Sequence, residues 1–367
     1  MKRPLHLTQK TLLRFALQGT VLGVLAGSLV ILFTVDANTL EHFQQFRWSV
    51  NLLLFPLIFL AWLCNGCRIL VLSRSLGYPL RYTQTLAVSL SSEFGIAATP
   101  AGMGGAIIRL SLLRRAGVSL AHGTTMLATD IALDTLFFTL LFPFALLSLL
   151  RNRKLIALFH TNRAEAWIPV GLWLVLGILL LLFLIRTKAA RRRIKFFFHA
   201  SLFKRYRVPA RIRYTRRRLM AGLRQMREGF HILFRLRPES ILANFGLAAI
   251  QWTCRYSILP IVLYAFSIPN DPILFFLLQG ILFTFSLFFV LPGGGGGVEV
   301  MTALILPLII PHSLVGIVIL IWRFFTYHLY LLGGGITFFT TCARLNTLFP
   351  QPVSPEEEEE MLFGNTR

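Results

Sequence analysis

Two stretches of the chain place glycine, proline and charge together inside otherwise apolar sequence. The first runs from Glu93 to Arg109 and contains Pro100, Gly102, Gly104 and Gly105. The second contains Pro292, a glycine run that begins Gly293, Gly294, Gly295, and then Glu299. Glycine lets a ligand approach backbone N–H groups closely, and arginine binds phosphate through two parallel hydrogen bonds. These residue types together favour the binding of an anionic group.

Charged residues also occur in apolar segments away from the glycines, at Asp130, Asp134, Arg255 and Arg323. A charge at the centre of a bilayer costs about 2.5–3.5 kcal/mol on insertion scales, so such residues are candidate functional groups. Asp130 and Asp134 are four residues apart and share a helix face, as do Arg323 and Tyr327. We interpret the arginines as phosphate ligands and the acids as groups that position them and the glycine loops.

A structural interpretation competes with this one. Glu93 with Arg109, and Glu299 with Arg323, would then be ion pairs that fix the two glycine-containing stretches. Tyr327 would pack against neighbouring helices, and the Gly333–Gly335 run would allow close helix approach or a kink.

Composition indicates the environment of the chain. Of 367 residues, 55% are hydrophobic and 14% are charged, and the mean hydropathy is +0.68. A soluble domain carries about 25% charged residues. The sequence therefore predicts an all-α polytopic membrane protein.

Six apolar segments are expected to span the membrane, at 13–35, 50–72, 122–150, 166–186, 240–266 and 313–341. Two further stretches, 82–113 and 272–310, each consist of two apolar segments, or arms, separated by a break that is rich in glycine and proline. We predict two re-entrant hairpins that enter from opposite faces and form an inverted repeat. Non-helical backbone is tolerated at membrane depth only where protein buries it or water reaches it, so the two breaks should meet at a binding site.

The net charge of +22 is concentrated in one connection. Between Arg186 and Arg237 there are eighteen lysines and arginines and one acid, Glu228. Basic loops stay on the cytoplasmic side, which places both termini inside, with Arg68, Arg74 and Arg81 on the cytoplasmic flank of the second span. No base-reading element is visible, so we expect no nucleic-acid partner.

Within that connection, apolar residues from Leu219 to Leu233 recur at helical spacing among arginines. They predict an amphipathic basic helix that lies on the membrane or packs on its neighbours. We expect one transmembrane domain over 1–345, with halves at about 10–186 and 239–345 around the loop 187–238. The acidic tail, 346–367, is expected to be cytoplasmic and disordered.

Motifs for catalysis are missing from the sequence. There is no GxSxG, HExxH, P-loop or paired CxxC, and Cys64 to Cys67 reads as small-residue helix packing rather than a redox or zinc site. We expect no metal, no cofactor and no enzymatic activity. An integral glycosyl- or acyltransferase acting on a lipid acceptor remains the alternative, and a small-solute or ion carrier is a third.

In its glycine-containing stretches and in the charged residues of its apolar segments, the chain resembles the lysylphosphatidylglycerol synthase transmembrane-domain family. This family includes the flippase-like domain of the multiple peptide resistance factor and stand-alone inner-membrane relatives. The matching stretches are Ser92–Phe94, Thr99–Gly105, Arg109–Leu113, Asp130 with Asp134, Pro292–Gly294 with Glu299, and Arg323–Tyr327. Many relatives carry an acid after the first Gly-Gly, where this chain has Ala106, and Glu93 is the candidate replacement.

The resemblance implies a lipid translocase of the bacterial inner membrane. Its cargo would be an anionic phospholipid, an aminoacyl-phospholipid or a polyprenyl-phosphate-linked lipid, bound by its head group. Enzymes of lipid biosynthesis are candidate partners, and the oligomeric state is left open.

Overall fold

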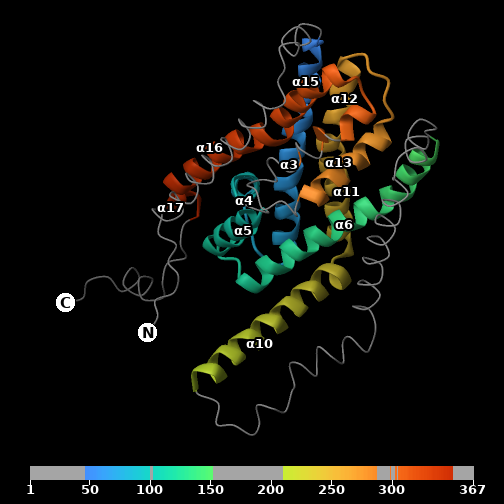
Figure 1. Cartoon of the computed structure of the whole chain (residues 1–367). Coiled ribbons are helices and arrows are strands. Elements are labelled where there is room, and N and C mark those ends of the chain that lie inside the picture. The colour runs from blue at the N-terminus through green and yellow to red at the C-terminus, as the bar shows by residue number, and fades with distance from the viewer. Residues whose placement is uncertain are drawn as a thin grey trace. The chain divides into compact units, whose positions relative to one another are not determined.

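The computed structural model describes residues 46–99, 102–151, 210–286, 298, 302–303 and 305–349, and these residues contain no strand (Figure 1). Chain contacts define two compact units, Met1–Ala145 with Gln225–Arg367, and Leu146–Arg224. The principal helices are α3 (Asn51–Ser75), α4 (Tyr82–Ala98), α5 (Met103–Arg115), α6 (Leu120–Arg151), α10 (Ala210–His231), α11 (Pro238–Tyr256), α12 (Ile258–Ala265), α13 (Pro272–Ser286), α15 (His312–Arg323) and α16 (Leu329–Ala343).

Shorter elements complete the described chain. They are the 3-10 turns η1 (Trp48–Val50) and η5 (Leu306–Leu308), the π-helical segments η4 (Ile232–Leu236) and η6 (Phe324–His328), and α17 (Leu345–Leu348).

Three helical segments of the described chain are long and apolar enough to cross a membrane. They are Trp48–Ser75, Leu120–Leu141 and Ser313–Ala343. These match the spans predicted at 50–72, 122–150 and 313–341, which are therefore confirmed as long apolar helices. The spans predicted at 13–35 and 166–186 lie outside the described residues.

The span predicted at 240–266 is not one continuous helix. It consists of α11 and α12, with a break at Ser257. Pro260 has no N–H to donate, which leaves the carbonyl of Tyr256 without its usual intrahelical partner. Gln279 of α13 supplies the missing donor, because its Nε2 lies 2.7 Å from that carbonyl oxygen. Its Oε1 accepts a 2.9 Å hydrogen bond from Nε1 of Trp322, so α13 ties the end of α11 to α15.

Two packed helices, α4 and α5, lie where the re-entrant hairpin was predicted at 82–113, and the re-entrant course itself stays a prediction. Gly102 begins α5 with φ +68°, a left-handed conformation that suits glycine, and Pro100 lies outside the described residues. Thr99 Oγ1 accepts from the Gly104 N–H at 2.8 Å and donates to the Gly95 carbonyl at 2.6 Å. A Cβ added at Gly95 would lie 2.7 Å from the carbonyl carbon of Gly104, so the two helices meet backbone to backbone.

Each arm of this hairpin is short for a membrane span. With 17 and 13 residues, α4 and α5 are about 25 and 20 Å long, against a hydrocarbon layer of about 30 Å. These lengths suit a hairpin that dips into the membrane, although entry from the cytoplasmic side stays a prediction. In the second hairpin, α13 is described, whereas Pro292, Gly293, Gly294, Gly295 and Glu299 lie outside the described residues.

Glycines on α16 fit it closely against α4 and against the Trp62 ring of α3. A Cβ at Gly334 would lie 2.7 Å from the Leu90 carbonyl oxygen, and one at Gly333 would lie 2.5 Å from the Trp62 ring. The close approach expected of the Gly333–Gly335 run is therefore confirmed.

Helix α10 confirms the helix predicted in the basic connection. Toward its C-terminal end, Thr125 of α6 donates a 3.4 Å hydrogen bond to the carbonyl of Met226, and Gly229 lies against His122 and Thr125. Leu233, which ends the apolar stripe in η4 just after α10, is fully buried. This end of the helix therefore packs on protein.

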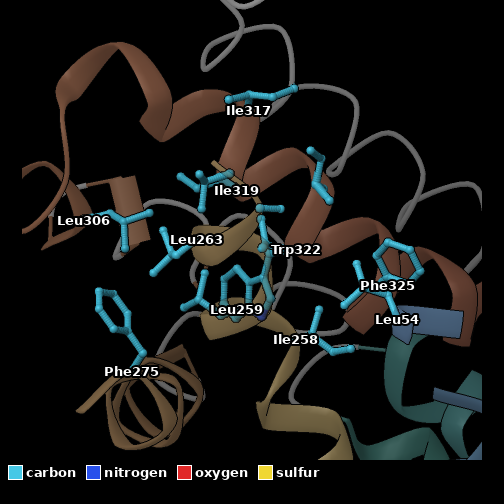
Figure 2. Packing of buried hydrophobic residues seen from close by; sticks show 14 of the residues in the cluster. Leu54, Ile258, Leu259, Leu263, Phe275, Leu306, Ile317, Ile319, Trp322 and Phe325 are labelled. Atoms are coloured by element: carbon cyan, nitrogen blue, oxygen red, sulfur yellow. The ribbon is translucent and has the colours of Figure 1, made fainter. Parts of the chain in front are cut away.

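Apolar clusters lie at both ends of α3. The larger one surrounds the first half of α3 and joins α12, α13 and α15 around Trp322 and Leu259 (Figure 2). The second begins at Ile69 and gathers Leu72, Leu113 and Met126. Asn65 and Arg68 lie on α3 between Ile58 of the first cluster and Ile69 of the second, so a polar layer separates the two.

Replacing Gly334 by alanine should lower the thermal stability of the detergent-solubilised protein, because the new methyl group would meet the Leu90 carbonyl. Overpacking of this kind costs about 1–3 kcal/mol. The matched control is Gly246→Ala on α11, where a Cβ meets nothing within 4 Å. It should be neutral or stabilising by up to about 1 kcal/mol. Equal melting temperatures for the two variants would contradict the close α4–α16 approach.

Candidate functional site

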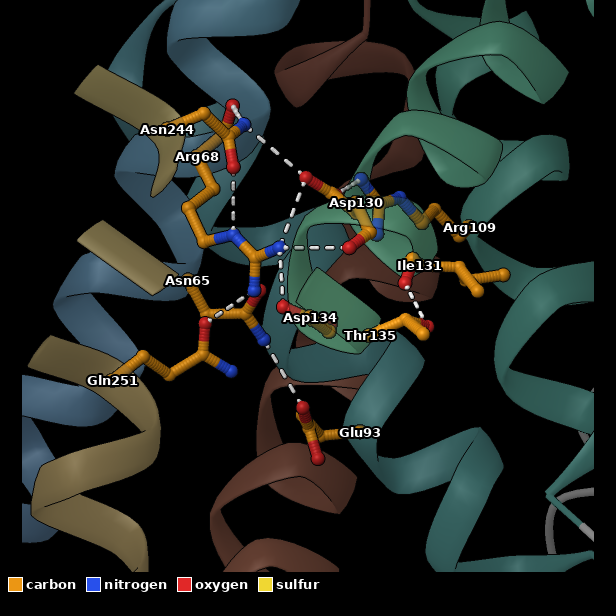
Figure 3. Close-up of polar contacts among 10 residues, drawn as sticks. All are labelled: Asn65, Arg68, Glu93, Arg109, Asp130, Ile131, Asp134, Thr135, Asn244 and Gln251. Atoms are coloured by element: carbon orange, nitrogen blue, oxygen red, sulfur yellow. Dashed lines mark hydrogen bonds and ion pairs between the residues drawn. The ribbon is translucent and has the colours of Figure 1, made fainter. Parts of the chain in front are cut away.

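Arg68 is the centre of the polar layer. It is 2% exposed and its guanidinium faces α11 on one side and α6 on the other (Figure 3). Nε donates to Asn244 Oδ1 at 3.0 Å, and Nη1 donates to Gln251 Oε1 at 2.9 Å. Nη2 lies 3.2 Å from Asp130 Oδ1, 3.3 Å from the Asp130 carbonyl and 2.7 Å from Asp134 Oδ1. One cation therefore binds α3, α6 and α11 together.

Asp130 connects this centre to α5. Its Oδ1 accepts from Arg68 and, at 3.2 Å, from Asn244 Nδ2. Its Oδ2 is ion-paired with Nη2 of Arg109. The carboxylate thus bridges two guanidinium groups, and its residue is only 3% exposed. The shared face predicted for Asp130 and Asp134 brings both acids to Arg68.

Glu93 forms a second branch of the layer. Its Oε1 accepts a 3.0 Å hydrogen bond from Asn65 Nδ2, one helical turn before Arg68 on α3. Its Oε2 lies 3.3 Å from Nη1 of Arg255, whose guanidinium carbon is 4.2 Å from the centroid of the Tyr330 ring. This arrangement combines an ion pair with a cation–π contact.

The Glu93–Arg109 ion pair of the competing structural interpretation does not form, because the register of the hairpin separates the two residues. A Cβ at Gly105 would lie 2.9 Å from the Ser92 carbonyl oxygen, so Gly105 faces the part of α4 that carries Glu93. Arg109 lies four residues further along α5, about 6 Å away along the helix axis. Each charge instead reaches a partner on another helix.

Arg323 and Tyr327 lie together where the last long helix becomes π-helical, at η6. The Arg323 guanidinium carbon is 4.6 Å from the centroid of the Tyr327 ring. The Tyr327 hydroxyl donates to the Ala97 carbonyl of α4 at 3.3 Å, near the hairpin tip. Single π-helical turns often occur at functional sites. The expected partner Glu299 lies outside the described residues.

The structure thus joins five of the predicted site residues, Glu93, Arg109, Asp130, Asp134 and Arg255, through Asn65 and Arg68 of α3. Gly102, Gly104 and Gly105 shape the hairpin tip. Arg68 itself was missed, since it read as the cytoplasmic flank of its span. Helix α3 continues to Ser75, which places Arg68 about two turns before the helix end.

Asn244 and Gln251 were also not predicted as site residues. They are seven residues apart on α11, and Arg255 follows four residues after Gln251, so all three lie on one helix face. A polar stripe on an otherwise apolar helix is the signal that could have identified them.

The charges of this network balance. Three arginines, Arg68, Arg109 and Arg255, face three acids, and Arg323 is a fourth buried cation. Nε of Arg109 and Nε of Arg255 are buried without a hydrogen-bond partner. Within the described ranges, no group of three or more His, Cys, Asp or Glu residues could hold a metal ion. The chemistry that these residues offer is recognition of an anion by guanidinium groups.

Long apolar helices around a buried ionic layer define a helical integral membrane protein. The chain belongs to the family described as lysylphosphatidylglycerol synthase TM region, whose profile matches residues 20–334. It is 22% identical over 320 residues to a UPF0104 membrane protein of Archaeoglobus fulgidus. The matched stretch makes up 87% of this chain and 94% of the relative. No solved structure matches the chain. The resemblance found in the sequence is confirmed at the level of the family.

Replacing Arg68 by glutamine should destabilise the protein by about 3–5 kcal/mol, because Asp130 and Asp134 would lose a buried counter-charge. Arg74→Gln is the control, since Arg74 lies on the same helix and is exposed. Thermal and denaturant unfolding in detergent measure both variants. An Arg68→Gln variant as stable as Arg74→Gln would contradict the central position of Arg68.

Proposed function

We propose that this chain is a lipid translocase, which moves a lipid with a phosphate-bearing head group between the leaflets of the bacterial inner membrane. The cargo class is an anionic phospholipid, an aminoacyl-phospholipid or a polyprenyl-phosphate-linked lipid. The observation that carries the proposal is a set of arginines among helices long enough to cross a membrane: Arg68, Arg109 and Arg323 are buried, and the Arg255 side chain is 14% exposed.

Several arginines at this depth support a role in binding a polar group. Ionisable residues inside membrane segments face protein or water-filled cavities and mark substrate pathways. Guanidinium groups suit phosphate because their fixed N–H pairs match two oxygens at once. Arg109 and Arg255 each keep a buried donor without a partner, and such a donor gains most from a ligand oxygen.

The surface of α6 supports an amphiphilic cargo. The Asp134 side chain, which is ion-paired with Arg68, is 25% exposed. Its helix neighbour Ile131, one turn earlier, is 58% exposed, and Leu136 and Leu140 are also exposed. An apolar outer face beside a polar opening would hold acyl chains in the bilayer while the head group reaches the arginines. In this proposal both glycine hairpins line the groove as an inverted repeat.

The family description supports a phospholipid in particular. It names lysylphosphatidylglycerol, a phospholipid whose head group carries both a phosphate and an amino acid, as the product of the synthases that give the family its name. The word synthase also keeps an integral transferase as the competing function. The two functions differ in whether a covalent product forms.

Liposomes that contain the purified protein should exchange labelled phosphatidylglycerol, aminoacyl-phosphatidylglycerol or polyprenyl phosphate between leaflets faster than empty liposomes. Arg255→Gln should slow this exchange at least about tenfold, since one charge-assisted contact to phosphate is worth about 1.5–3 kcal/mol. Arg74→Gln, exposed at the end of α3, should exchange lipid at the wild-type rate. Dithionite quenching of a head-group fluorophore measures the leaflet distribution.

No acceleration for any of the three lipids would contradict translocation. Covalent modification of the lipid by purified protein and a soluble donor, detected by mass spectrometry, would favour the transferase instead.

A further inference from the structure

Arg68 and Arg109 share one carboxylate, that of Asp130, but the structure holds them very differently. Arg68 contacts Asn244, Gln251, Asp130 and Asp134, so its donors are occupied on both sides. The guanidinium of Arg109 is ion-paired with Asp130, and its Nε has no hydrogen-bond partner although the residue is only 8% exposed. Arg109 is therefore the cation that can change partner at the smaller cost.

The surroundings of Asp130 are those of a bound anion. Its two oxygens accept from guanidinium groups on α3 and α5 and from the side-chain amide of Asn244 on α11. Two oxygens of a phosphate would take the same donors in the same way. Asp130 thus occupies donors of the kind that the phosphate of a head group would use, among them Arg109.

The backbone that carries Arg109 is fixed. Gly104 and Gly105 hold α5 against α4 at distances that leave no room for a side chain. A change of partner by Arg109 therefore occurs in its long, flexible side chain and leaves the α4–α5 hairpin in place.

We propose that Asp130 is a built-in competitor for the head-group site and that Arg109 exchanges between them. Without lipid, Arg109 pairs with Asp130 and the polar layer is neutral. With lipid, Arg109 turns to the head-group phosphate, while Asp130 keeps Arg68 and Asn244. This mechanism rests on the proposed function. It adds that Asp130 lowers the apparent affinity for the lipid, because the head group must displace Asp130 from Arg109 in order to bind.

Titration of purified protein with inorganic phosphate, and separately with a short-chain phosphatidylglycerol, tests this mechanism. Asp130→Asn keeps the shape of the side chain and removes its charge, so it should tighten the binding of phosphatidylglycerol at least about tenfold. Glu239→Gln is the control, because it removes one exposed acid at the start of α11 and should leave affinity unchanged. The double variant Asp130→Asn with Arg109→Gln should lose the gain.

A second variant covers the case in which Asp130→Asn does not fold, as judged by size-exclusion chromatography. Asn244→Ala removes one of the donors that Asp130 keeps when Arg109 leaves, so Asp130 should hold Arg109 more strongly and phosphatidylglycerol should bind more weakly, by a smaller factor.

Unchanged or weaker binding by Asp130→Asn would overturn the mechanism, as would an equal gain in Glu239→Gln. If Asp130→Asn does not fold, unchanged or tighter binding by Asn244→Ala would overturn it. A gain for inorganic phosphate without one for phosphatidylglycerol would overturn the lipid as the competing ligand. Leaflet exchange by the wild-type protein separates the two proposals. Tighter binding by Asp130→Asn without leaflet exchange by the wild-type protein would contradict translocation alone. Leaflet exchange without tighter binding by Asp130→Asn would contradict the competition by Asp130 alone.

Discussion

The organisation of the polar layer depends on one buried cation. A guanidinium at the depth of Arg68 cannot remain unpaired, since the desolvation of an isolated charge would exceed what the surrounding apolar packing returns. Its partners come from two other helices, α6 and α11, and each must present an acceptor at one level. The register of three helices is therefore set by one side chain. Asp130 carries this constraint on to α5, and Asn65 with Glu93 carries it to Arg255.

Apolar packing fixes what lies on either side of that layer. The cluster around Trp322 and the cluster around Leu72 enclose the two ends of α3. Glycine contacts then bring α4 close to α5 and α16. The result is a layer in which arginines and acids from several helices lie at one level of the structure.

Much of this fold follows from local sequence. Three long apolar helices follow from length and composition, and the α4–α5 hairpin follows from the cluster of glycine and proline near Gly102. The break at Ser257 does not follow, although Pro260 is visible in the sequence. Whether a freed carbonyl finds a donor depends on Gln279, which is 23 residues from Tyr256 and comes from another helix.

In the site, too, the types of residue could be predicted from the sequence, whereas their partners could not. Charges in apolar segments pointed to Asp130, Asp134 and Arg255, because burying a charge is costly wherever it occurs. Their partners depend on tertiary register, and the actual partner of Glu93 lies 162 residues away. Asn244 and Gln251 carry no charge, so a search for charges in apolar segments passes over them. The second glycine run, with Glu299, and its inverted-repeat relation to the first hairpin stay predictions.

The helix pairs that run closely side by side are α3 with α11, α4 with α16, α4 with α5, and α3 with α4. Helix α6 reaches this set through long side chains, notably Arg68, Arg109 and the ring contact of Phe138 with Trp252. Backbone contacts with no intervening side chain resist sliding, whereas ionic and ring contacts can lengthen or re-form. Among the described helices, the contacts of α6 with these five therefore include charge pairs and a ring contact, and the charge pairs answer directly to any change in the charges of the polar layer.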